Sequence, residues 1–278
     1  MSELLAPALA AGYAVPAFAA WNAESVRTIL TVAREHRAPV ILMHAPPDFH
    51  LLPPATYAAV IAPLIAECEV PVAVHLDHGE SLAEVSACLA AGYSSVMLDF
   101  SARPFDENVA GLRETVALAR PLGVTVEGEI GHVGRVDDST EEGGLISTLT
   151  TVDEAVAYLE ATGVEALAVS IGNAHGKYTA LPRLDFDRLA ELHAALPVPL
   201  VLHGGSGTPE EDLKRAISLG IAKVNVATEL VTALRESLQA QWAAGDKRWL
   251  TRTLADATAA LAPVVERWIL RLGAAGQG

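Results

Sequence analysis

The length, composition and charge of the chain narrow the function classes at the outset. Its 278 residues are close to the roughly 250 residues that an α/β barrel uses for one domain, and 51% hydrophobic residues supply a large core. The formal net charge is -15, from 34 acidic and 19 basic residues. Because such a surface repels polyphosphate backbones and anionic lipids, we expect no nucleic acid and no membrane as partners.

The N-terminal segment and the two cysteines indicate the cellular compartment. Residues Leu4–Trp21 carry no charge, but two prolines and a glycine interrupt them, so a short helix followed by a strand is expected instead of a membrane span. No Lys or Arg precedes them, as a secretory signal would require. We expect Cys68 and Cys88 to stay reduced in the core and the protein to be cytoplasmic.

Eight short, branched-aliphatic runs recur along the chain, each followed by a polar or glycine turn and a longer stretch with helical periodicity. No linker or low-complexity tract separates them, so residues 1–278 are predicted to form one domain. The runs predict strands at Tyr13–Phe18, Pro39–Met43, Pro71–Leu76, Ser95–Leu98, Val124–Glu127, Ala166–Ile171, Pro199–Leu202 and Ala222–Val226.

Helix start signals follow several of these runs. In a capping box, a hydroxyl and a carboxylate satisfy the free N–H groups of the first helical turn. Such starts are predicted at Ser81 with Glu84, at Thr151 with Glu154, and at Thr208 with Pro209 and Glu211. Eight alternating strand and helix units predict an α/β fold, a (β/α)8 TIM barrel, with its chemistry where the strands end.

Polar residues follow six consecutive predicted strands, from the third to the eighth. One such residue would more commonly be a turn cap or a hydrogen-bonded core histidine, but six in succession predict a site on one rim of the barrel. The segments are His75-Leu76-Asp77-His78-Gly79, Asp99, Glu127-Gly128-Glu129, Asn173-Ala174-His175-Gly176, His203-Gly204-Gly205-Ser206-Gly207 and Asn225-Val226-Ala227-Thr228.

Three histidines at these strand ends, His78, His175 and His203, suit a zinc site that keeps an open position for substrate. Imidazole ligands favour zinc over ions that prefer oxygen. The other six histidines have competing interpretations. His75 is expected to be a buried, hydrogen-bonded residue, His36 and His193 to lie on helix surfaces, and His44, His50 and His132 to lie in loops that could face the site.

Two glycine- or hydroxyl-bearing loops predict an anion site beside this metal. In His203–Thr208 the glycines allow close approach of the backbone to a ligand, and the following helix directs free N–H groups toward it. In Asn225–Thr228 another helix is expected to begin directly after the eighth strand. Loops after the seventh and eighth strands form a recurrent phosphate site in barrel enzymes.

These segments also carry a family resemblance. The chain resembles the class II, metal-dependent ketose-bisphosphate aldolases, the fructose- and tagatose-bisphosphate aldolase family, over essentially its whole length. The resemblance implies a lyase (an aldehyde-lyase) of carbohydrate metabolism that reversibly cleaves a ketose phosphate or bisphosphate to dihydroxyacetone phosphate and an aldehyde. It also implies one Zn²⁺ per chain, allows a monovalent cation, and suggests a homodimer or homotetramer. The most specific matches are His75–Gly79, Gly172–Tyr178, Leu202–Gly207 and Lys223–Leu230.

The resemblance assigns roles residue by residue. It implies zinc ligands at His78, His175 and His203 and a catalytic acid/base at Asp77. Asp99, Glu127 and Glu129 correspond to an outer or alternative metal environment. Dihydroxyacetone phosphate would be bound by Gly176, Gly204, Gly205, Ser206, Asn225, Val226, Ala227 and Thr228.

The chain departs from the family pattern on the aldehyde side. Ala19, Met43 and Ala45 stand where the family usually has Asn, Gln and Ser, in the half of the pocket that holds the aldehyde and its distal phosphate. In the loop after the fifth strand, Arg135 replaces a glycine, and Asp137 replaces the usual catalytic Glu. The donor half is therefore expected to be ordinary and the aldehyde non-standard, with repacking around fructose or tagatose bisphosphate as the alternative.

Three other readings compete with this one. A Schiff-base aldolase needs a strand lysine with a lowered pKa, and of Lys177, Lys214, Lys223 and Lys247 only Lys223 lies in a predicted strand, where a structural role is expected. The chain could instead be a class II aldolase of another sugar or inositol pathway. A non-catalytic sugar-phosphate-binding barrel is the third alternative, although the retained Asp77 and three histidines argue against it.

Overall fold

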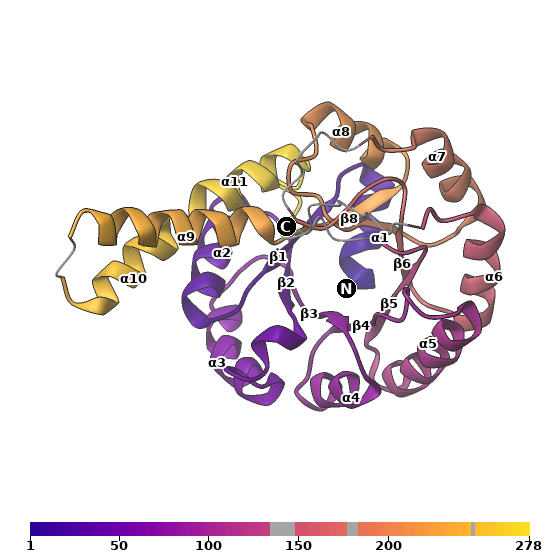
Figure 1. Ribbon diagram of the computed structural model, residues 1–278, viewed down its shortest axis with the longest axis horizontal. Coiled ribbons are helices and arrows are strands. Elements are labelled where there is room, and N and C mark those ends of the chain that lie inside the picture. Colours follow the sequence, from indigo (N-terminus) through magenta and orange to yellow (C-terminus); the bar gives the residue numbers. More distant parts are fainter. Residues whose placement is uncertain (134–147, 177–182, 246–247) are drawn as a thin grey trace, which may run out of the picture.

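The computed structural model describes residues 1–133, 148–176, 183–245 and 248–278. Its eight parallel strands close into a barrel in chain order, because β1 pairs with both β2 and β8 (Figure 1). The predicted (β/α)8 barrel is confirmed, and each predicted run overlaps one strand. The strands are β1 (Val15–Ala19), β2 (Val40–His44), β3 (Val72–Gly79), β4 (Ser95–Leu98), β5 (Thr125–Ile130), β6 (Ala166–Val169), β7 (Leu200–Leu202) and β8 (Ile221–Val226).

Most helices form a ring around the barrel, whereas α9 and α10 project beyond it beside α2 and α11 (Figure 1). Within the described ranges, no helix is long and apolar enough to cross a membrane. The helices are α1 (Ser2–Ala11), α2 (Ala23–Glu35), η1 (Pro46–Asp48), α3 (Pro54–Ala66), α4 (Leu82–Ala90), α5 (Phe105–Ala119), η2 (Arg120–Leu122), α6 (Val152–Thr162), α7 (Phe186–Ala195), α8 (Glu210–Ser218), α9 (Thr228–Ala243), α10 (Leu250–Ala259) and α11 (Ala262–Arg271).

The N-terminal segment is a helix followed by a strand, as predicted. Helix α1 lies at the end of the barrel where the strands begin: Ser2 N donates to Thr125 Oγ1 at the start of β5, and Met1 Sδ accepts from Ser95 Oγ at the start of β4. Helix α1 therefore covers this end of the barrel, and the opposite rim, where the strands end, is the one that can hold a site. Both cysteines are free, with Cys88 buried and Cys68 half-buried.

Two of the three predicted helix starts are present. Ser81 and Glu84 form a complete capping box, and Thr151 Oγ1 accepts from Glu154 N. The predicted cap at Thr208 is wrong, because α8 begins after Pro209 and has no side-chain cap. Helix α8 instead carries three acidic residues in its first turn, which interact favourably with the positive end of the helix dipole.

The histidines outside the site separate into core and surface residues. His75 is buried with Nδ1 2.8 Å from Ser95 Oγ, as predicted, and His36 and His193 lie half-buried at α2 and on α7. The loop position predicted for His44 is wrong. His44 ends β2, stacks on Tyr57 at 3.9 Å and lies 2.6 Å from the hydroxyl of Tyr93, and burial lowers its pKa to about 4. His44 is paired in register with Leu76 and stacks on Tyr57 of α3, so it faces the helices and not the site.

Candidate functional site

The ends of β3, β6 and β7 bring three histidines together on one rim of the barrel. Ligand atoms of His78, His175 and His203 all lie within 4.8 Å of one another. The ring centroids of His78 and His203 are 4.7 Å apart, and that of His175 lies 4.9 Å from His78. The sequence prediction that these residues meet is therefore confirmed. His50, in contrast, is exposed after η1.

A local irregularity of β3 places two consecutive side chains in the site. In a regular strand Asp77 and His78 would point to opposite faces of the sheet. The register with β4 shifts between Leu76 and Gly79, and His78 has a φ of 49°, in the left-handed region that non-glycine residues rarely adopt. A Cβ at Gly79 would lie 2.7 Å from the carbonyl oxygen of Met97, so the bulge requires glycine there. Such backbone strain is typical of functional sites.

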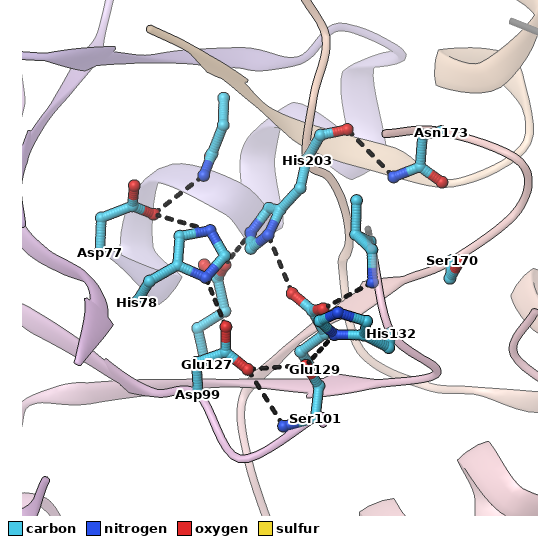
Figure 2. Close-up of polar contacts among 12 residues, drawn as sticks. Asp77, His78, Asp99, Ser101, Glu127, Glu129, His132, Ser170, Asn173 and His203 are labelled. Atoms are coloured by element: carbon cyan, nitrogen blue, oxygen red, sulfur yellow. Dashed lines mark hydrogen bonds and ion pairs between the residues drawn. The ribbon is translucent and has the colours of Figure 1, made fainter. Parts of the chain in front are cut away.

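The imidazole of His78 is oriented by Asp99. His78 Nδ1 lies 2.7 Å from Asp99 Oδ2, and Asp99 Oδ1 accepts hydrogen bonds from the backbone N–H and the hydroxyl of Ser101 (Figure 2). Burial would raise the pKa of Asp99, but the hydrogen bonds from His78 and Ser101 outweigh it and hold the pKa well below its usual range. A carboxylate that fixes one ring nitrogen leaves the other, Nε2, to face a ligand.

His203 lies between two buried glutamates. Its Nε2 is 3.0 Å from Glu127 Oε1, and its Nδ1 is 3.0 Å from Glu129 Oε2 (Figure 2). Burial alone would lower the pKa of His203, but the contacts with both carboxylates outweigh it and raise the pKa to about 10. In the metal-free protein His203 is therefore an imidazolium that compensates the charge of two carboxylates.

The carboxylate of Glu127 has a second cationic partner. The fully buried ammonium of Lys223 lies 2.8 Å from Glu127 Oε2 and donates to Oε1 at 3.0 Å. Burial would raise the pKa of Glu127, but Lys223, His75 and His203 lower it well below its usual range. This pairing agrees with the structural role expected of Lys223.

Asp77 combines a fixed position with access to solvent. Its Oδ1 accepts from Asn225 Nδ2 at 3.0 Å, and its side chain is 14% exposed. Burial would raise the pKa of Asp77, but the positive charges of His78, Lys223 and His203 outweigh it and lower the pKa. Asp77 is thus a carboxylate at neutral pH and is held 4.0 Å from His78 Nε2, where it can accept a proton.

The donor set fits a metal ion on grounds internal to the structure. His78 Nε2 is buried without a hydrogen-bond partner in the described part of the chain and can ligate a metal. His203 Nδ1 and Glu129 Oε2, which can also ligate a metal, lie 3.0 Å apart as an ion pair but without hydrogen-bond geometry. His78, Asp99 and Glu129 form a second group with atoms within 4.8 Å of one another. Three imidazoles suit zinc, and the second group offers two oxygens and one nitrogen.

Close backbone approach shapes the two predicted phosphate loops. At Gly204, with a φ of 65°, a Cβ would lie 1.9 Å from the carbonyl oxygen of Ala174, so the loop after β7 lies directly on the segment that leads to His175 and Gly176. A Cβ at Gly205 would lie 2.5 Å from Val224 Cγ1 of β8. Gly176, Gly204 to Ser206, and Asn225 to Thr228 are thus brought to one side of the rim.

The hydroxyls in these loops agree with an anion site. Ser206 Oγ and Thr208 Oγ1 are buried and have no hydrogen-bond partner among the described residues. Helix α9 begins at Thr228, directly after Val226 and Ala227 at the end of β8, as predicted. Its first N–H groups are therefore available at the rim.

The three apolar departures lie together at neighbouring strand ends. Ala19, the last residue of β1, is paired in register with Met43 of β2, and Ala45 follows β2. Met43 is buried and Ala19 is half-buried. Arg135 and Asp137, as well as Lys177, Tyr178 and Lys247, lie outside the described residues.

The structure adds Ser101, which sequence analysis did not single out, and gives Asn173 a partner that the sequence did not indicate. Ser101 fixes Asp99 and lies 3.1 Å from His132 Nδ1, which places His132 at the rim. Asn173 Nδ2 donates to the carbonyl oxygen of His203 at 3.0 Å and holds that loop in place (Figure 2). The Asp99-x-Ser101 spacing is a local turn signal that could have indicated Ser101, whereas nothing local indicates the bond from Asn173.

Comparisons with known proteins agree with this geometry. The family model for class II fructose-bisphosphate aldolases matches residues 1–277. The YdjI aldolase of Escherichia coli K12 is 32% identical, with a TM-score of 0.88 over 99% of this chain and 97% of that one. The fructose-bisphosphate aldolase of Campylobacter jejuni is 22% identical, with a TM-score of 0.83 over 99% of this chain and 95% of that one, a likeness of fold.

The raised pKa of His203 predicts how pH affects the metal-free protein. An imidazolium whose pKa is about 10 in the folded state and about 6.5 when unfolded contributes stability that is full below pH 6.5 and is lost as pH rises toward 10. For the metal-free protein, kept so by a chelator, we expect the free energy of unfolding to fall by several kcal/mol between pH 7 and 9.5. Denaturant titrations of the wild type and His203→Gln measure this; the same pH slope in both would contradict it.

Proposed function

Because the chain belongs to the class II fructose-bisphosphate aldolase family, whose members are lyases, we propose that it is a zinc-dependent aldehyde-lyase. It reversibly cleaves a ketose phosphate or bisphosphate to dihydroxyacetone phosphate and an aldehyde. The observation that carries this proposal is the convergence of His78, His175 and His203 beside the carboxylate of Asp77.

The three histidines would hold one zinc ion per chain. When bound, zinc supplies a Lewis acid that polarises the substrate carbonyl and stabilises the negative charge left by C–C cleavage. Asp99 and Glu129 orient the imidazoles of His78 and His203 and, in this proposal, form the alternative metal environment together with His78. Glu127 holds His203 from its other nitrogen and is itself neutralised by Lys223.

Asp77 would be the acid/base. In cleavage it removes the proton of the substrate hydroxyl; the C–C bond then breaks and its electron pair stays on the three-carbon donor, while the aldehyde leaves. In condensation Asp77 returns the proton. The hydrogen bond from Asn225 fixes the carboxylate at the rim. We assign proton transfer on the donor carbon to Asp137.

The loops after β6, β7 and β8 would bind the phosphate of dihydroxyacetone phosphate. Close backbone approach at Gly204 and Gly205, the left-handed backbone of Gly176, the hydroxyls of Ser206 and Thr228, and the chain from Asn225 through Val226 and Ala227 supply this donor half. A donor held in this way loses little orientational freedom in the reaction, which lowers the barrier.

The remaining expectations concern the state of the protein. We expect one domain over residues 1–278, a homodimer or homotetramer, a cytoplasmic location and a small sugar phosphate as the partner molecule, with a monovalent cation as a further cofactor. The Schiff-base alternative is disfavoured because the Lys223 ammonium is buried and paired with both oxygens of Glu127. The non-catalytic alternative is separated by the assays below.

The metal assignment is tested by removing a ligand. We expect about one zinc per purified chain and loss of turnover on chelation. His203→Ala should lose both zinc and activity. Circular dichroism should still report a folded barrel, with a lower melting temperature because the variant removes the cation between Glu127 and Glu129. His36→Ala, a half-buried control at the C-terminal end of α2, should keep both zinc and activity. Full activity after exhaustive metal removal, with borohydride and substrate trapping Lys223, would overturn the assignment in favour of a Schiff base.

The role of Asp77 is tested by separating chemistry from binding. Asp77→Ala should retain zinc and the affinity for dihydroxyacetone phosphate but lower turnover by about two to four orders of magnitude, the usual range for a general acid/base. Glu80→Ala changes an exposed carboxylate three residues away and should stay near the wild-type rate. Cleavage by Asp77→Ala at nearly the native rate would refute its role.

The apolar cluster of Ala19, Met43 and Ala45 predicts a non-standard aldehyde, either smaller or less polar than glyceraldehyde 3-phosphate or with an anionic group met by Arg135. A pocket without hydrogen-bond partners discriminates against polar groups that would be buried unpaired. We therefore expect a higher kcat/KM for ketose 1-phosphates with apolar or short tails, or with an anionic tail, than for fructose 1,6-bisphosphate.

A variant that restores polarity provides the matched control. Ala19→Asn, Met43→Gln and Ala45→Ser together should shift the kcat/KM ratio toward fructose 1,6-bisphosphate. A clear preference of the wild-type protein for fructose 1,6-bisphosphate, with the efficiency of a dedicated enzyme, would end the non-standard reading.

A further inference from the structure

The loop after β7 is held from behind by the last helix of the chain. Arg271 of α11 donates to the carbonyl oxygen of Thr208, and its guanidinium lies over the ring of Trp268, 4.5 Å from the centroid. The ring of Trp268 is fully buried, and one of its carbons would lie 3.6 Å from a Cβ at Gly205. Helix α11 therefore contacts both ends of the loop that carries Ser206.

One carboxylate joins this helix to the two loops of the anion site. Glu229, in the first turn of α9, accepts from Gly207 N at 3.2 Å through Oε1. Its Oε2 accepts from Trp268 Nε1 at 3.1 Å and from Arg267 Nη2 at 2.5 Å. The residue after Thr228 is thus bonded to the loop after β7 and to α11 at once.

The directions of these bonds determine what the loop can offer a ligand. The N–H of Gly207 donates to Glu229 and is not available to a ligand. Gly207 also has a φ of 87°, a backbone conformation that residues with a side chain rarely adopt. With this residue fixed, the hydroxyl of Ser206 stays buried and without a hydrogen-bond partner among the described residues. A loop free to relax would instead bond that hydroxyl to its own backbone.

The charge of Glu229 requires its partner. A carboxylate one residue from Thr228 would repel a phosphate dianion in a site of low dielectric constant. The guanidinium of Arg267 lies against this carboxylate and compensates it, so that Glu229 can serve as an acceptor near an anion site.

We propose that Glu229 is a positioning residue for phosphate binding: its carboxylate, neutralised by Arg267 and bonded to Trp268, holds the Gly204–Thr208 loop in its binding conformation. This rests on the proposed function insofar as the ligand is the donor phosphate. Glu229 touches no reacting atom, so its contribution is to affinity for the phosphate group and not to the chemical step.

The mildest test removes one donor and keeps the packing. Trp268→Phe deletes the indole N–H, and Glu229→Ala deletes all three bonds. Since a hydrogen bond to a charged group contributes about tenfold or more in affinity, both variants should raise KM for the ketose phosphate and Kd for inorganic phosphate by about tenfold or more. The kcat and the zinc content should stay within about threefold of the wild type. Glu266→Gln, an exposed change on the same helix, should alter neither constant.

A double-variant cycle separates positioning from general weakening. If Trp268 acts through the carboxylate, Glu229→Ala with Trp268→Phe should bind phosphate no more weakly than Glu229→Ala alone. Glu229→Gln keeps one acceptor oxygen and should have an intermediate effect. Additive losses in the double variant, or a fall in kcat with KM unchanged, would overturn the proposal.

Hydrogen exchange makes the result independent of catalysis. Without ligand, amides of the Gly204–Thr208 loop should exchange faster in Glu229→Ala and Trp268→Phe than in the wild type, while the amides of β3 and β5 keep their protection. Unchanged exchange in this loop would refute the positioning role even if the variants bind phosphate weakly. If the variants exchange faster but the wild type neither binds phosphate nor cleaves a ketose phosphate, the proposed function is refuted. The link between Glu229 and the Gly204–Thr208 loop would still stand.

Discussion

Alternating buried charge in the barrel interior underlies the arrangement of the rim. Lys223, Glu127, His203 and Glu129 follow one another at distances of 2.8 to 3.0 Å, and all four are buried. Two cations and two anions compensate each other, which makes such a group tolerable inside a protein, whereas the loss of one member would leave an unpaired charge there. His203 is thereby both part of the core and a candidate metal ligand. Replacing its proton by a metal ion keeps the cluster compensated.

Much of the fold could be predicted because its signals are local. Branched-aliphatic runs, glycine stops and capping boxes each lie within a few residues, and eight repeats of the same unit left few alternatives to a barrel. The meeting of His78, His175 and His203 then followed, because parallel strands end on the same rim. A local signal that is compatible with two structures gave a wrong prediction at Thr208. Thr208 resembles a helix cap, but in the structure its carbonyl oxygen is bonded by α11.

The partners of the site residues could not be predicted, because they depend on contacts far apart in sequence. The bond between Asn225 and Asp77 spans 148 positions, and that between Lys223 and Glu127 spans 96. His44 shows the same limit in the core, since its burial depends on Tyr57 of α3 and on Tyr93 in the turn between α4 and β4. The sequence also does not indicate the left-handed backbone at His78, although the glycine that follows it is a partial signal.

The dependence of the rim on α11 has a consequence for synthesis on the ribosome. The three histidines have all been translated by residue 203, but the strand that closes the barrel ends at Val226 and the helix that fixes the loop after β7 ends at Arg271. A growing chain that has not yet reached α11 therefore carries every candidate ligand without the support of a finished loop.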